Sequence, residues 1–186
     1  MTLFRLLAST LLCASLAACA PWARVDSSSR LESKRNDYTL ELPLGWVKRT
    51  ADINDFFITR DGPALNVILV NRQPHDRKLP RTKRETRADM LPHEIAELAI
   101  AEWKGSESTA NLEVIANAPA TLGGRPAARL HIRYKNERGL SIDRLMIGHV
   151  DAKGRLTLMY EAPAIVYFQR GLADFEAMVA SVRFQS

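Results

Sequence analysis

Alternating apolar and polar side chains in the second half of the chain constrain the fold most strongly. The alternation runs through residues 112–117, 127–135, 140–150 and 155–161, and a period of two residues is typical of β-strands. The links between these segments are short and rich in turn-forming residues, as at Gly123-Gly124. Because none of the links is long enough for the crossover that parallel strands need, the segments are predicted to form an antiparallel meander.

The part of the chain before this meander contains shorter predicted strands. Residues 38–42 alternate with the same period, and Pro43-Leu44-Gly45 turns the chain into a second short extended piece at Trp46. Residues 56–60 and 65–70 flank Asp61-Gly62-Pro63, which is a typical turn sequence. We therefore expect a hairpin here.

Two segments have helical periodicity instead. The first is predicted over residues 89–104, with Asp89 as its N-cap and Pro92 in its first turn. The second is predicted over residues 165–181, followed by a short extended piece at 182–184. The expected buried stripes are Leu91, Ile95, Leu98 and Ala99 on the first helix, and Phe168, Leu172, Phe175 and Val179 on the second. Helices that pack such stripes on an antiparallel sheet give an α+β fold.

The order of these elements resembles the PsbP-like fold family. The resemblance rests on the pattern Y-x-L-x-L-P-x-G-W from Tyr38 to Trp46, on Leu122-Gly123-Gly124-Arg125-Pro126-Ala127 within the meander, and on the closing Ser181-Val182-Arg183-Phe184. It covers residues 38–184, and it implies an antiparallel sheet meander packed by two helices in an α/β/α sandwich. It also implies a binding or assembly module more often than a catalyst. No functional residue of the family is carried over to this sequence.

The N-terminus has the features of an export signal. A positively charged start ending at Arg5 precedes the apolar run 6–16, which is too short to span a bilayer. The run ends in Leu16-Ala17-Ala18-Cys19, which looks like the lipobox of bacterial lipoproteins, in which the cysteine sulfur carries a diacylglycerol. We therefore predict a signal peptide at residues 1–18 and lipidation of Cys19. The alternative is cleavage after Ala20, which would leave Pro21 as a poorly accepted first residue.

Lipidation at Cys19 has consequences for the rest of the chain. Cys13 would leave with the signal peptide, so the mature domain would have no free thiol. The polar residues up to 36 predict a flexible tether at 19–36, followed by a single domain at 37–186, a size that one hydrophobic core can stabilise. Two or more acyl chains would hold the protein on a membrane. Because Ala20 is not an aspartate, we expect the periplasmic face of the outer membrane if the cell is Gram-negative.

No pattern in the sequence identifies a catalyst. His93-Glu94 begins like the zinc-protease motif H-E-x-x-H, but Glu97 occupies the position of the second histidine. There is no G-x-S-x-G elbow and no phosphate-binding glycine loop. We therefore expect no enzyme activity, metal or cofactor. The alternatives are a hydrolase or metal-dependent enzyme, favoured if two histidines meet a carboxylate, and a carrier of a small apolar ligand, favoured by a cavity between sheet and helix.

The strongest candidate for binding is a basic segment. Residues 72–87 carry seven bases against Asp76 and Glu85, a local charge of +5, whereas the rest of the mature chain sums to about −1. Such a segment fits anionic lipid, lipopolysaccharide or an acidic envelope protein, although it could also be a solubilising loop. Nucleic acid is not expected for an exported chain. The candidate binding residues are Arg72, Arg77, Lys78, Arg81, Lys83, Arg84 and Arg87.

Two further features involve charge on regular elements. Alternation on the strand 127–135 predicts an exposed basic row of Arg129, His131, Arg133 and Lys135. Glu102 falls within the apolar stripe of the first helix, which leaves open whether it reaches solvent or pairs with a base.

Overall fold

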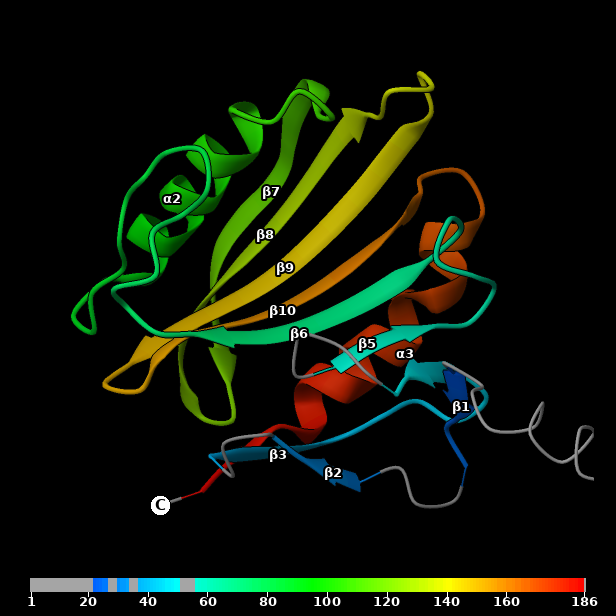
Figure 1. Ribbon diagram of the computed structural model, residues 1–186, viewed down its shortest axis with the longest axis horizontal. Coiled ribbons are helices and arrows are strands. Elements are labelled where there is room, and N and C mark those ends of the chain that lie inside the picture. Colours follow the sequence, from blue (N-terminus) through cyan, green and yellow to red (C-terminus); the bar gives the residue numbers. More distant parts are fainter. Residues whose placement is uncertain (1–21, 27–29, 34–36, 51–55, 186) are drawn as a thin grey trace, which may run out of the picture.

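The computed structural model describes residues 22–26, 30–33, 37–50 and 56–185. This part of the chain forms two antiparallel sheets and two helices in layers (Figure 1). The predicted signal peptide and Cys19 lie outside the described residues. Within the described ranges, no helix has both the length and the apolar character needed to cross a membrane.

The larger sheet confirms the predicted meander and the predicted hairpin. Its last four strands in the chain pair in sequence order, and β10 then pairs with β6 on its other side. The hairpin of β5 and β6 extends the sheet further. In spatial order the strands are β1 (Trp22–Arg24), β4 (Val47–Arg49), β5 (Phe56–Thr59), β6 (Val67–Gln73), β10 (Gly154–Pro163), β9 (Ser141–Asp151), β8 (Arg125–Lys135) and β7 (Ala110–Leu122).

Part of the predicted tether is instead strand. Residues 22–24 form β1, which pairs with β4 at the edge of the large sheet, and the ring of Trp22 lies 5.7 Å from that of Phe57. Residues 30–32 form β2, which belongs to a small sheet with the order β11 (Arg183–Phe184), β3 (Tyr38–Glu41), β2 (Arg30–Glu32). The prediction was wrong here because strands of three residues are too short to show an alternation, and the partner of β1 is also distant in sequence.

Each face of the large sheet packs against other elements. The helix α3 (Tyr167–Ser181) and the small sheet cover one face, around fully buried Trp46, Tyr160 and Phe175. The helix α2 (Pro92–Lys104) packs on β7, β8 and β9 of the opposite face, over Leu130 and Ile132. The result is the predicted α+β sandwich.

The start of α2 differs from the prediction. The helix begins at Pro92, and its cap is Leu91, whose backbone N–H donates to the carboxylate of Glu94 at 2.7 Å. Asp89 is not the cap, and Leu91 is 55% exposed rather than part of the buried stripe. Proline is favoured at the first helical position, because its missing N–H would have no partner there.

Candidate anion-binding loop

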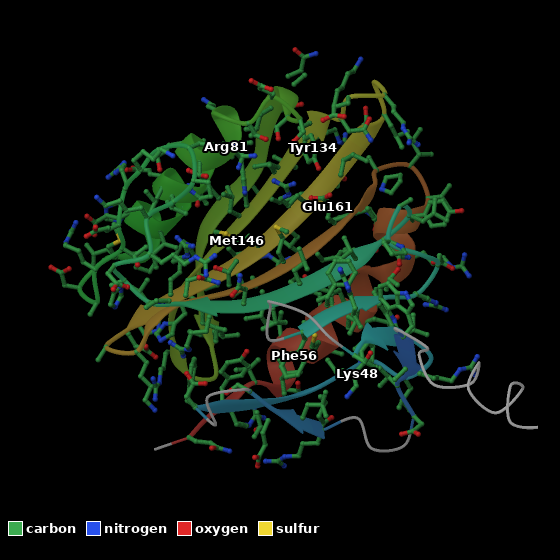
Figure 2. All side chains as sticks on the ribbon, in the orientation of Figure 1. Lys48, Phe56, Arg81, Tyr134, Met146 and Glu161 are labelled. Carbon is green, nitrogen blue, oxygen red and sulfur yellow. The ribbon has the colours of Figure 1, made fainter. Side chains whose placement is uncertain are left out.

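The predicted basic segment lies mainly in the loop of residues 74–91, which connects β6 to α2. The side chains of this loop extend from the left edge of the molecule in Figure 2. Leu79 and Met90 are buried in the core beneath α2, and Thr86 is buried as well. The loop therefore has its own fixed inner side, and its charged residues lie on the outer side.

A tight turn at the tip of the loop presents the most basic stretch. The backbone N–H of Leu79 donates to the carbonyl of Arg84 at 2.9 Å, and that of Lys83 donates to the carbonyl of Leu79 at 3.0 Å. Lys83 has a φ of 58°, in the left-handed region that few non-glycine residues adopt. These two backbone hydrogen bonds help to hold Lys83 in that conformation.

Glu102 fixes the same turn from the side of α2. Its carboxylate accepts the backbone N–H groups of Arg81 at 3.0 Å and Thr82 at 2.9 Å, and the hydroxyl of Thr82 at 3.0 Å. The guanidinium of Arg81 adds an ion pair at 3.5 Å. The acidic residue in the apolar stripe therefore neither reaches solvent nor serves only as an ion-pair partner, because it also binds the backbone of the loop.

The ionisation of Glu102 follows from these contacts. Burial alone raises the pKa of a carboxyl group, because it disfavours the charged form. The hydrogen bonds from Thr82 and Arg81, together with the charge of Arg81, outweigh burial and lower the pKa of Glu102 below its ordinary value of 4.5. The anionic form that accepts these hydrogen bonds is thus the favoured form.

The histidine at the start of the loop attaches it to the large sheet. One ring nitrogen of His75 lies 2.9 Å from the hydroxyl of Thr86, and the other lies 2.7 Å from the backbone carbonyl of Asp151. Both ring nitrogens are therefore in hydrogen-bond contact, which gives His75 a structural position.

Arg72 must be removed from the candidate binding set. The strand β6 continues through Gln73, and its alternation places Arg72 on the same buried face as Val70. The Nε of Arg72 lies 2.6 Å from Oδ2 of Asp37, and its Nη1 lies 2.8 Å from Oδ1 of Asp151. With a side chain only 1% exposed and two carboxylate partners, Arg72 is not available to an external anion.

The network around Arg72 extends along the edge of the sandwich. Arg125 reaches the second oxygen of Asp151 at 3.2 Å, and His149 lies 3.5 Å from the same oxygen. Burial opposes the ionisation of Asp151, but the hydrogen bond and charge of Arg72, followed by the N–H of Lys153, lower its pKa below the ordinary 3.8. Since Asp37 precedes β3, the network also connects the small sheet to the large one.

Apart from Arg72, the six other bases of the predicted basic segment are all exposed. Three of them have ion-pair partners nearby: Lys78 with Glu85 at 3.8 Å, Arg81 with Glu102, and Arg87 with Asp89 at 3.1 Å. The side chains of the other three form no ion pair or hydrogen bond with any residue of the described ranges. These three free cations, which we call the basic tip, are Arg77, Lys83 and Arg84.

The second predicted basic row is exposed only in part. Arg129 forms a bidentate ion pair with Glu176 of α3. His131 stacks on Phe168, with ring centroids 5.0 Å apart. Arg133 pairs in the same way with buried Asp143. Arg133 and Lys135 are exposed as predicted, but the prediction failed for Arg129 and His131, because α3 covers them with Glu176 and Phe168.

The four histidines do not form a metal site. His75 contacts only the backbone carbonyl of Asp151, and His149 lies 3.5 Å from the carboxylate of Asp151, which two arginines already bind. His131 lies 3.5 Å from Asp143 on a different part of the sheet. His93 is exposed on α2. Among the residues that the structure describes, no group of three or more histidine, cysteine or acidic side chains is arranged to hold a metal ion.

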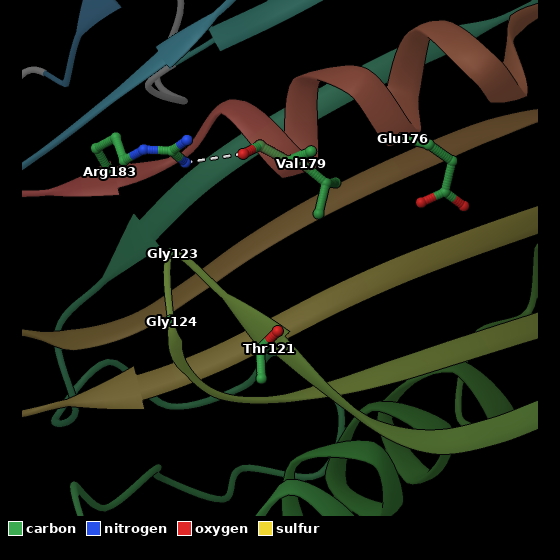
Figure 3. Close-up of a pocket in the computed structure, with 7 residues that line it drawn as sticks. Thr121, Gly123, Gly124, Glu176, Val179 and Arg183 are labelled. Carbon is green, nitrogen blue, oxygen red and sulfur yellow. Dashed lines mark hydrogen bonds between the residues drawn. The ribbon is translucent and has the colours of Figure 1, made fainter.

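A pocket of about 520 Å³ lies between the turn after β7 and the end of α3 (Figure 3). Its charged groups already have partners, because Arg183 donates to the carbonyl of Ala180 at 2.8 Å and Glu176 pairs with Arg129. The turn itself consists of Gly123 and Gly124, both with positive φ. This pocket therefore offers an external ligand little unpaired charge.

Comparison with known proteins identifies the fold. No protein-family model matches the sequence, and no curated protein matches it. The Ran-binding protein Mog1p of Saccharomyces cerevisiae superposes with a TM-score of 0.56 at 8% identity, covering 87% of this chain and 96% of Mog1p. The cyanobacterial PsbP protein CyanoP of Synechocystis gives a TM-score of 0.52 at 12% identity, covering 90% of this chain and 95% of CyanoP. The chain has the PsbP/Mog1-like fold.

A longer protein also matches. A protein of Bacteroides thetaiotaomicron has a TM-score of 0.50 at 9% identity over 87% of this chain, and the chain spans half of its length. At these identities the likeness concerns the fold alone, because one fold carries many functions. The resemblance to PsbP-like proteins is confirmed at the level of fold, and the functional argument depends on the residues of this chain.

Proposed function

We propose that the protein is a lipid-anchored module of the cell envelope, without a catalytic role, that binds clustered phosphates at the membrane surface through its basic tip. The observation that carries this proposal is the contrast within the loop. Leu79, Glu102 and His75 fix its inner side, while Arg77, Lys83 and Arg84 remain exposed and unpaired. A solubilising loop needs exposed charge, but it does not need a fixed conformation.

Two attachments would orient the domain. The predicted lipid at Cys19 lies three residues before β1, which is an edge strand of the large sheet. The strand β6 lies three strands further in, about 14 Å away at the usual spacing between strands. The basic loop begins at the end of β6 and lies at the opposite side of the molecule from β1 (Figure 1). Each base at an anionic surface contributes on the order of 1 kcal/mol. Three unpaired bases are therefore enough to favour one orientation on the membrane.

The loop can be tested apart from the anchor in a Cys19→Ser background. We expect this variant to bind vesicles that contain phosphatidylglycerol, and to bind phosphatidylcholine vesicles much more weakly. Charge reversal of the basic tip (Arg77→Glu, Lys83→Glu, Arg84→Glu) should abolish the difference. The matched control reverses three exposed bases outside the loop, Lys104, Lys135 and Arg138, and should retain most of the binding.

Two results would contradict the proposal. If both triple variants bind equally, the basic tip has no special role and general charge explains the association. If the tip variant keeps its vesicle binding but loses a co-purifying acidic protein, the partner is a protein rather than a membrane. The anchor itself is tested by mass spectrometry of the N-terminal peptide, where an unmodified Cys19 would refute lipidation.

A further inference from the structure

The second pocket lies between α2 and the large sheet and has a volume of about 120 Å³. Its walls come from three elements. Ile95, Leu98, Ala99, Glu102 and Trp103 belong to α2, Arg155, Thr157 and Met159 belong to β10, and Leu79 comes from the loop. This lining is mostly apolar, and the volume is close to the cavity of about 150 Å³ that is known to hold benzene.

One cation, Arg155, also lines this pocket. Arg155 lies on β10, on the same face as Thr157 and Met159, and it is half-buried. Its side chain forms no hydrogen bond or ion pair with any residue of the described ranges. The nearby carboxylate of Glu102 already accepts hydrogen bonds from Arg81 and Thr82. Burial lowers the pKa of Arg155, and the charge of Glu102 only partly offsets that effect.

An unpaired guanidinium in an apolar pocket points to an anionic ligand. Burying a charge without a partner is unfavourable, and a guanidinium pairs best with a planar carboxylate through two hydrogen bonds. Glu102 also lines this pocket, so its negative charge opposes the binding of an anion and disfavours a ligand with two charges most strongly.

An apolar row leads away from the pocket across the sheet. Met159 lies opposite Leu69 of β6, and Leu69 lies opposite Phe57 of β5, all three half-buried on the same face. The row ends at Phe57, because the guanidinium of Arg49 lies over the Phe57 ring, 5.2 Å from its centroid. Figure 1 shows that α2 lies to one side of these strands, and it packs on β7, β8 and β9. An apolar chain can therefore extend from the pocket along the sheet.

We propose that this pocket binds the carboxylate of a small amphiphile, with Arg155 as its ion-pair partner and its apolar chain between Trp103 and Met159. The ligand class is a monocarboxylate with an unbranched hydrocarbon chain. This binding site is separate from the basic tip, and it depends on neither the tip nor the lipid anchor.

Isothermal titration of the full chain tests this proposal with octanoate, and with octanol as the uncharged probe of equal chain length. We expect octanoate to bind at least tenfold more tightly than octanol. Arg155→Gln should weaken octanoate binding ten- to a hundredfold, since charged hydrogen bonds are lost, and should leave octanol unaffected. The control, Arg138→Gln, removes an exposed arginine in a distant turn and should bind octanoate like the original protein.

A second variant blocks the apolar part of the pocket without changing charge. Ala99→Phe should abolish octanoate binding while the protein remains folded, as judged by its thermal unfolding. Octanoate that binds Ala99→Phe or Arg155→Gln as well as it binds the original protein would overturn the proposal. Equal affinity for octanoate and octanol, or no measurable heat with octanoate, would overturn it too.

Discussion

The carboxylate of Glu102 on α2 accepts the backbone N–H of Thr82, twenty residues earlier in the chain, at 2.9 Å. This contact joins a helix to the tip of a loop through a charged group that is only 6% exposed. Removing the charge should release the turn. We expect Glu102→Gln to lower the free energy of unfolding by about 1–3 kcal/mol, the usual cost of weakening buried hydrogen bonds to a charged group.

Urea denaturation followed by circular dichroism measures this change. The matched control is Glu97→Gln, which alters an exposed glutamate on the same helix and should change stability by less than about 0.5 kcal/mol. Hydrogen exchange should also become faster at the amides of Arg81 and Thr82 in the Glu102 variant. Unchanged exchange at these two amides would show that the carboxylate does not hold the loop.

Acid should destabilise the protein through the same groups. The pKa values of Glu102 and Asp151 are both lower in the folded protein than their ordinary 4.5 and 3.8. Each group therefore contributes stability that is complete above its ordinary pKa and is lost as the pH falls through its lowered value. We expect the free energy of unfolding to fall with pH below about 4.5, and to fall less steeply in Glu102→Gln.

The ion pair between Arg72 and Asp37 is expected to be sensitive to loss of one partner. Arg72→Met leaves Asp37 buried without its nearest cation, which costs about 3–5 kcal/mol for pairs of this kind. Adding Asp37→Asn should recover part of that loss, because the uncompensated charge is then removed. Thermal unfolding of the two single variants and the double variant measures the coupling energy between Arg72 and Asp37. If the stability losses of the two single variants simply add in the double variant, the two residues are not coupled.

Gly171 of α3 allows close contact between the helix and the sheet. A Cβ at this position would lie 2.4 Å from the hydroxyl of Tyr160, which itself donates to the carbonyl of Tyr167 at 2.7 Å. Although alanine favours helices, we expect Gly171→Ala to destabilise the protein by about 1–3 kcal/mol through this overlap. Tyr160→Phe should partly rescue it. A stabilising Gly171→Ala would mean that the helix shifts freely on the sheet.

The regular part of the fold could be predicted because its signals are local. The two-residue alternation and short links of the last four strands determine an antiparallel meander, and the helical stripe around Phe168 and Phe175 gives α3. The short strands at Trp22 and Arg30 could not be found in this way. They are strands because β4 and β3 pair with them. The partner of β1 is distant in sequence, whereas β2 pairs with the strand that follows it but is too short to show an alternation.

In the candidate sites too, local sequence signals could be recognised, whereas contacts between distant residues could not. Composition alone located the basic loop. To see that Arg72 is buried while Arg84 is exposed, one must know that β6 extends through Gln73 and therefore includes Arg72. Glu102 was recognisable as unusual, while its partners were backbone groups, which leave no signal in a sequence. Arg155 carried no signal at all, because an arginine on an alternating strand is ordinary until the structure shows that the carboxylate nearest to it is already bound by other groups.

The pairing of β1 has a consequence for how far the protein can range from its membrane. With Trp22 already held in the large sheet, at most about 10 Å of chain separates the folded body from position 19. If that position carries acyl chains, as we propose, the body stays within about one protein radius of the bilayer. Lateral diffusion in the plane of the membrane, rather than excursions into the space beyond it, would then decide which molecules it meets.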